Sequence, residues 1–95
     1  MNFSQALEEL KLGKKVARKG WEKGAFIYLV ESREVNIENL RGEAAKHFEA
    51  YKDSNRGKRV TINSHIDMKT ADGSLLVGWR PSQDDMLADD WEVVF

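Results

Sequence analysis

The sequence lacks cysteine altogether and holds only one proline and two histidines among its 95 residues. The absence of cysteine excludes disulfides, thiolate nucleophiles and cysteine-ligated zinc, which a small secreted domain would normally use for stability. No apolar run is long enough to span a bilayer, and the first residues contain no apolar signal segment. We therefore expect a cytoplasmic protein that has no membrane partner.

The sequence also lacks a strong charge of either sign. It has 15 Lys and Arg against 16 Asp and Glu, a net charge of -1. Residues 1–69 hold 14 bases and 10 acids, which is +4, whereas residues 70–95 hold 1 base and 6 acids, which is -5. A nucleic acid polymer would call for a basic face that neutralises several phosphates, so it is not the expected partner. A small charged ligand remains possible.

The composition predicts one folded domain over residues 1–95, because 41% of the residues are hydrophobic and 33% are charged. An N-terminal helix is indicated by the cap at Asn2, with Gln5 three residues on, and by a stop at Gly13. Residues 15–18 alternate as a short strand does, and the apolar run 26–30 is typical of a central strand.

The second half of the sequence indicates one more substantial helix and a meander of strands. Apolar positions from Ile37 to Tyr51 step by three and four, which predicts a second, amphipathic helix that Gly42 weakens. The polar stretch 53–57 is typical of a loop. Alternation of apolar and polar residues predicts strands around 60–62 and 66–68. The apolar run 75–77 predicts a further strand, and apolar residues at 91, 93 and 95 suggest a closing strand.

Local turn signals complete the fold prediction. Asp72-Gly73 is a strong hairpin signal, and Ser82 with Asp85 forms a capping box for a short helix after Pro81. The element order therefore predicts an α+β fold, a small single domain with a mainly antiparallel β-sheet, an N-terminal helix and a second amphipathic helix. No internal repeat or linker interrupts it.

The histidines and aspartates give weak signals for catalysis or metal binding. His47 is interpreted as a surface residue, because its spacing from His65 does not suggest a metal site. On a strand, His65 and Asp67 point to the same face, so they are an acid/base pair, a hydrogen-bonded surface pair or ligand contacts. No glycine-rich phosphate loop is present, and the aspartates at 84–90 lack the spacing of a calcium loop. We expect no cofactor and no metal.

The three tryptophans are the more informative residues. Trp91 falls on a predicted strand in step with Val93 and Phe95 and is interpreted as core. Trp21 and Trp79 each follow a glycine at the edge of a strand, a position that suits core packing and ligand contact equally. Arg18 precedes Trp21, and polar residues follow Trp79, so both rings have hydrogen-bonding groups nearby. An aromatic ring beside polar groups is what a nucleotide pocket requires. The polar residues after Trp79 are Ser82, Gln83 and Asp85.

Three stretches, MNFSQALEELKLGKKVARKGW, HIDMKTADG and WRPSQDDMLADDWEVV, closely resemble the second type of Thoeris anti-defence protein. The resemblance covers residues 1–30 and 65–95. It implies a phage-encoded sponge that acts in the cytoplasm of the bacterial host. Such a sponge sequesters cyclic ADP-ribose signals made by TIR enzymes, and in some members cyclic dinucleotides, without cleaving them.

The resemblance also implies a homotetramer with pockets between subunits, in which aromatic side chains stack on the bases. Trp21 and Trp79 would be these stacking side chains. Asp84 stands where the family commonly has threonine, and it adds negative charge near the pocket. The remaining implied ligand contacts are polar: Ser82, Gln83, Asp85, Arg18 and Asp67.

Two other functions stay open at this point. The first is a hydrolase that degrades such signals with His65 and Asp67 as its acid/base pair. The second is a protein-interaction domain that uses the second helix and the acidic tail as its contact surfaces. Binding without catalysis is the favoured hypothesis, because no nucleophile accompanies the His65 and Asp67 pair.

Overall fold

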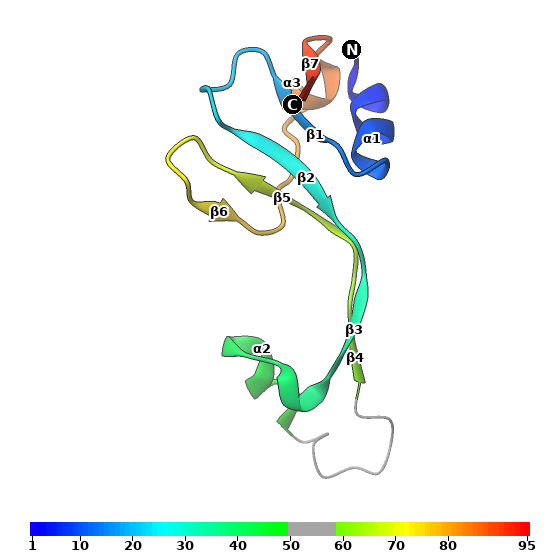
Figure 1. The fold of residues 1–95 in the computed structure, drawn as a ribbon, viewed down its shortest axis with the longest axis vertical. Coiled ribbons are helices and arrows are strands. Elements are labelled where there is room, and N and C mark those ends of the chain that lie inside the picture. The colour runs from blue at the N-terminus through cyan, green and yellow to red at the C-terminus, as the bar shows by residue number, and fades with distance from the viewer. Residues whose placement is uncertain (50–58) are drawn as a thin grey trace. The chain divides into compact units, whose positions relative to one another are not determined.

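A computed structural model of the protein describes residues 1–49 and 59–95. Its internal contacts divide the chain into two compact units, Met1–Val30 with His65–Phe95, and Glu31–Ser64. Helices and antiparallel strands make up both units, and a helix begins the chain (Figure 1). The predicted α+β class is confirmed.

Helix α1 (Phe3–Lys11) forms where the capping residues predict it. The side chain of Asn2 accepts a hydrogen bond from the backbone of Gln5 at 2.9 Å, and the Gln5 side chain accepts one from the backbone of Asn2 at 2.8 Å. The helix ends before Gly13, whose φ of 84° is left-handed. Both ends of α1 are therefore set by residues next to them in the sequence.

The first unit is built on a five-stranded antiparallel sheet with the order β6-β5-β2-β1-β7. Strand β2 lies at its centre, as predicted for the apolar run. The last strand returns to pair with β1, where Val16 lies opposite Val93 and Arg18 opposite Trp91. The predicted closing strand is therefore confirmed. The five strands are β1 (Lys15–Arg18), β2 (Phe26–Val30), β5 (His65–Lys69), β6 (Leu75–Leu76) and β7 (Trp91–Val94).

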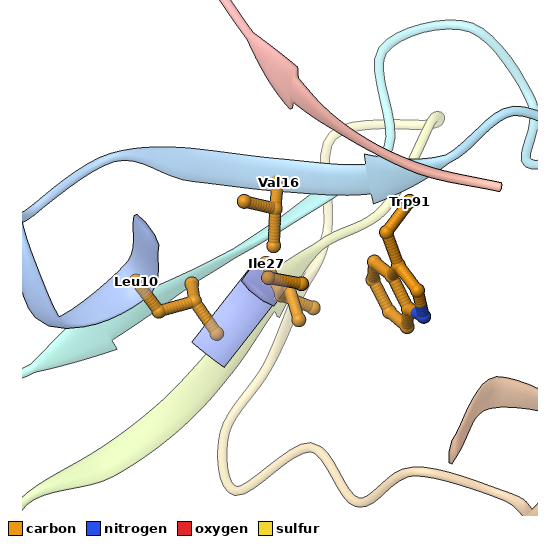
Figure 2. Close-up of a cluster of buried hydrophobic side chains, with 5 residues drawn as sticks. Leu10, Val16, Ile27 and Trp91 are labelled. Atoms are coloured by element: carbon orange, nitrogen blue, oxygen red, sulfur yellow. The ribbon is translucent and has the colours of Figure 1, made fainter. Parts of the chain in front are cut away.

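The hydrophobic core lies between α1 and one face of this sheet. Val16 and Ile27 are opposite each other on β1 and β2 and are fully buried. Leu10 of α1 and Trp91 of β7 converge on the same region, as Figure 2 shows, and the ring of Phe3 packs against Trp91 with centroids 5.4 Å apart. This core joins the two ends of the chain.

The turn between β5 and β6 confirms the Asp72-Gly73 hairpin signal. Gly73 has a φ of 91°, and the Asp72 carboxylate accepts hydrogen bonds from the backbone and hydroxyl of Ser74 at 3.1 and 2.9 Å. Hydrogen bonds from the Thr70 hydroxyl and then from Ser74 lower the pKa of Asp72 from 3.8 to about 2. The charged carboxylate therefore stabilises this turn.

Helix α3 (Gln83–Leu87) follows Pro81 and has the predicted capping box. The Ser82 hydroxyl accepts from the backbone of Asp85 at 3.1 Å, and the Asp85 carboxylate accepts from the backbone of Ser82 at 2.9 Å. The helix ends at Leu87, because the backbone of Ala88 is extended, with a ψ of 150°. One helical turn is thus fixed in front of β7.

The second unit contains an antiparallel pair, β3 (Arg33–Asn36) with β4 (Arg59–Ile62), in which Val35 lies opposite Val60. Strand β4 agrees with the predicted alternation around residues 60–62. Strand β3 was not predicted, because only Val35 within it is apolar. Its backbone is ordered by pairing with β4, which sequence periodicity does not reveal.

The second helix is present in this unit but is much shorter than the periodicity from Ile37 to Tyr51 predicts. A 3-10 turn, η1 (Ile37–Asn39), and helix α2 (Gly42–Lys46) are separated by Leu40, whose ψ of 142° is extended. Gly42, the first residue of α2, has a φ of 67°, so a continuous right-handed helix cannot extend across it from η1. The predicted loop at 53–57 and the end of the predicted helix lie outside the described residues.

Leu10→Ala should destabilise the protein strongly. Leu10 is 1% exposed in the core, so its truncation leaves a cavity and should lower the free energy of unfolding by about 2–5 kcal/mol. The matched control is Leu12→Ala, because Leu12 is 71% exposed and its truncation should change stability by no more than about 0.5 kcal/mol. Urea denaturation followed by circular dichroism measures both, and equal losses would contradict this core assignment.

Asp72→Asn should destabilise the protein at neutral pH but not at strongly acidic pH. The folded pKa of about 2 lies below the usual 3.8, so the charged carboxylate adds stability above about pH 4. That contribution is lost as the pH falls through about 2. Thermal melts from pH 7 to pH 2 should therefore show the difference between variant and wild type closing at low pH. A difference that stays constant to pH 2 would mean that the charge is not responsible.

Candidate functional site

The structure brings the three tryptophans together in the first unit. The ring centroids of Trp21 and Trp79 are 6.0 Å apart, and those rings lie 5.3 and 6.2 Å from the ring of Trp91. All three pairs are edge-to-face, with interplanar angles of 71°, 79° and 82°. This geometry is one that aromatic pairs prefer. The three rings form what we call the tryptophan cluster.

Members of the tryptophan cluster differ in exposure. Trp91 is 1% exposed and its indole Nε1 donates to the backbone oxygen of Asp85 at 2.9 Å. The prediction that Trp91 belongs to the core is therefore confirmed. Trp21 and Trp79 are only half-buried and pack against that core from outside. Each keeps part of its ring at the surface, where a ligand could contact it.

Arg18 connects β1 to the segment that precedes β7. Its Nε donates to Asp90 at 3.0 Å and its Nη1 donates to Asp85 at 3.0 Å. Both hydrogen bonds raise the pKa of the Arg18 guanidinium, and the one to Asp90 contributes more than the one to Asp85. The two carboxylates offset its positive charge, so a bound anion would feel that charge only in part.

The polar residues after Trp79 are largely occupied within the fold. Partial burial acts to raise the pKa of Asp85, but hydrogen bonds from the Ser82 backbone and from Arg18 outweigh it, and the pKa lies below its usual value. Ser82 is exposed, yet its hydroxyl caps α3. Gln83 is exposed at the first turn of α3. A ligand at these residues would meet an ionised Asp85 that is already paired.

Asp67 and His65 lie on the same face of β5, as predicted from the strand alternation. His65 Nε2 is 3.5 Å from Asp67 Oδ1. Asp67 is 5% exposed, and the same oxygen accepts a hydrogen bond from the backbone N–H of Gly78 at 3.0 Å. The two side chains are thus adjacent, but the carboxylate is buried in a structural contact. Their use as an acid/base pair stays a hypothesis.

A pocket of about 290 Å³ opens beside Trp21. The turn between β1 and β2 forms one wall, and β7 contributes Glu92 and Val94 to another. Arg18 also lines the pocket, together with Lys19 and Lys23. The lining, within the described part of the chain, does not include the other predicted contacts, which are Trp79, Ser82, Gln83, Asp85 and Asp67.

Some pocket residues were not predicted from the sequence. Lys19 and Lys23 stand two residues to either side of Trp21, in the stretch KGWEK, so the same glycine-flanked turn that singled out Trp21 could have indicated them. Glu92 is different, because it reaches the pocket only through the pairing of β7 with β1, opposite Ala17. No local signal in the sequence identifies that pairing.

Within residues 1–49 and 59–95, no three His, Cys, Asp or Glu side chains gather in a way that could hold a metal ion. No helix among the same residues has the length and apolar character needed to cross a membrane.

Comparison with known proteins identifies the family. The model of the Thoeris anti-defense 2-like domain matches residues 1–94. The protein Thoeris anti-defense 2 of Bacillus phage SP01 is 36% identical over 95 residues, which cover 99% of this chain and 94% of that protein. Both matches extend over almost the whole chain, and they support a role in phage anti-defence. The chain therefore belongs to the Thoeris anti-defence 2 family.

Proposed function

We propose that the protein binds and sequesters a cyclic nucleotide immune signal without cleaving it. The proposed ligand is glycocyclic ADP-ribose made by TIR enzymes in the cytoplasm of the bacterial host, with cyclic dinucleotides as a second class. Membership of the Thoeris anti-defence 2 family supports the biological setting. The pocket beside Trp21 supports the chemistry.

The half-buried ring of Trp21, which lines a pocket, is the observation that carries the proposal. Trp79 and Trp91 both contact this ring edge-on, so its plane is fixed before any ligand arrives. A fixed aromatic face can stack on an adenine base, and it loses little conformational entropy on binding. Stacking on Trp21 would therefore anchor the base of the signal.

The pyrophosphate of such a signal needs positive charge, which the pocket supplies through its lysines. Lys19 and Lys23 are exposed at the pocket wall, and no ion pair of either side chain is found in the described part of the chain. Arg18, by contrast, is held by Asp85 and Asp90. We assign the phosphate contacts to the two lysines and a positioning role to Arg18.

The size of the pocket supports a site shared between copies of the chain. Pockets for small molecules usually enclose roughly 300–1,000 Å³, and about 290 Å³ is small for a ligand with two nucleoside-sized parts. In the proposed homotetramer, a neighbouring chain completes the pocket. The exposed part of Trp79, with Ser82 and Gln83, would then contact ligand at that boundary.

Hydrolysis of the signal by His65 and Asp67 is the alternative. The 3.5 Å approach of the two side chains is the observation in its favour. Against it, Asp67 is buried and already accepts the N–H of Gly78. A general base must reach the proton that it removes. Sequestration is therefore the better-supported function.

Trp21→Ala should weaken binding of glycocyclic ADP-ribose by about five- to 150-fold, because stacking of one base on an aromatic ring contributes roughly 1–3 kcal/mol. Trp21→Phe keeps a smaller aromatic face and should retain most of the affinity. Calorimetry gives the affinities, and native mass spectrometry reports how many chains and ligands each complex holds. Leu12→Ala, at an exposed position just after α1 and outside the pocket, is the control. Binding to Trp21→Ala at wild-type affinity would rule out this pocket.

The signal should be recovered intact after binding. Glycocyclic ADP-ribose is incubated with the protein, the protein is then denatured, and the released nucleotide is analysed by chromatography. A sponge returns all of the ligand unchanged, and His65→Ala behaves as wild type does. A product that forms with wild type and disappears with His65→Ala would establish the hydrolase instead.

A further inference from the structure

The segment that leads to Trp79 departs from the regular pairing of β5 and β6. Met68 lies opposite Leu76, and unchanged continuation of that register would pair Gly78 with Ile66. Instead, the backbone oxygen of Ile66 accepts from the N–H of Trp79 at 2.7 Å. The chain just beyond β6 therefore carries one extra residue, in the turn formed by Val77 and Gly78, and we call this feature the bulge.

Gly78 is the residue that makes this bulge possible. Its φ is +78°, and no heavy atom lies within 4 Å of the position that a Cβ would take. The requirement for glycine is thus conformational rather than steric. A glycine in the left-handed region at the first position is typical of one class of bulge.

The bulge decides which way Trp79 points. Side chains on a strand alternate between faces, and Ile66 and Met68 pack against the core. In the regular register Trp79 would lie opposite His65 and point to the other face. The extra residue moves Trp79 to the core side, where its ring meets Trp21 and Trp91.

The bulge also removes the N–H of Gly78 from the strand ladder, because Ile66 now bonds to Trp79. Gly78 itself is exposed, but the carboxylate of Asp67 is buried and needs a hydrogen-bond donor there. This carboxylate accepts the N–H of Gly78 at 3.0 Å. Asp67 supplies the oxygen acceptor for this N–H, so it is the group that holds Gly78 in place.

We propose that Asp67 is a positioning residue: its carboxylate fixes the bulge at Gly78 and thereby turns Trp79 into the tryptophan cluster. Asp67 then acts on a ligand through Trp79 and does not contact the ligand itself. The effect on ligand affinity rests on the proposed function above. The effect on the orientation of Trp79 is independent of it.

The orientation is tested on the ligand-free protein by ¹H–¹⁵N NMR of the Gly78 amide and the Trp79 indole. Asp67→Ala should shift both resonances and speed hydrogen exchange at the Gly78 amide by at least about tenfold. Asp67→Asn keeps an oxygen acceptor and should leave both close to wild type. Asp72→Ala is the matched control, since it removes a carboxylate from the other end of the same hairpin and should leave Trp79 unchanged.

Gly78→Ala is a second test of the orientation of Trp79 if Asp67→Ala does not fold. It leaves Asp67 in place but strains the bulge, so the Trp79 indole resonance should move. Unchanged Trp79 resonances in Asp67→Ala, or in Gly78→Ala, would overturn the proposal.

Affinity for glycocyclic ADP-ribose separates positioning from direct contact. A positioning role predicts a loss of about tenfold in Asp67→Ala and no more than about threefold in Asp67→Asn. Equal losses in both variants, with the Asp67→Asn resonances of Trp79 unchanged, would mean that the carboxylate contacts the ligand, and the proposal fails. If the wild-type protein binds no such nucleotide, the proposed function fails, while the NMR comparison still decides the role of Asp67.

Discussion

Burial of Trp91 is the constraint on which the first unit depends. A buried indole must place its N–H on an acceptor, and here the backbone oxygen of Asp85 supplies it. That bond holds α3 against the start of β7, and Arg18 of β1 donates a hydrogen bond to the side chain of the same Asp85. The rings of Trp21 and Trp79 then pack on Trp91 from two different segments. The core and the candidate site therefore share one side chain.

Elements whose cause lies within a few residues could be predicted from the sequence. The caps at Asn2 and Ser82 and the turn at Asp72-Gly73 are made by neighbouring groups, and the structure has all three. Elements that depend on pairing with a distant segment, or on particular backbone angles, could not be predicted from the sequence. Strand β3 exists through β4, and the break at Leu40 and the bulge at Gly78 are set by backbone angles that apolar periodicity does not report.

The residues of the candidate site also differ in whether the sequence could predict them. Trp21 was identified by its position at the edge of a strand and Arg18 by its closeness to Trp21 in the sequence, and both line the pocket. Ser82 and Asp85 were selected because polar groups follow a tryptophan, but the same residues form a capping box. The cap uses their side-chain oxygen atoms as acceptors, so a ligand contact at Ser82 would rely on its hydroxyl as a donor. Glu92 could not be found at all, because only the fold brings it to the pocket.

Sequestration makes a different demand on a site than catalysis does. An enzyme must hold a reactive group free to act on its substrate, whereas a binding protein gains affinity by fixing its contacts beforehand. In the first unit the groups around the pocket are fixed in this way. Trp21 is held edge-on by two rings, and Arg18 by two carboxylates. Even Asp67, the residue best placed to serve as a base, is committed to a backbone N–H. The internal contacts that stabilise this small core are therefore the same ones that would prepare it to retain a ligand and leave it unchanged.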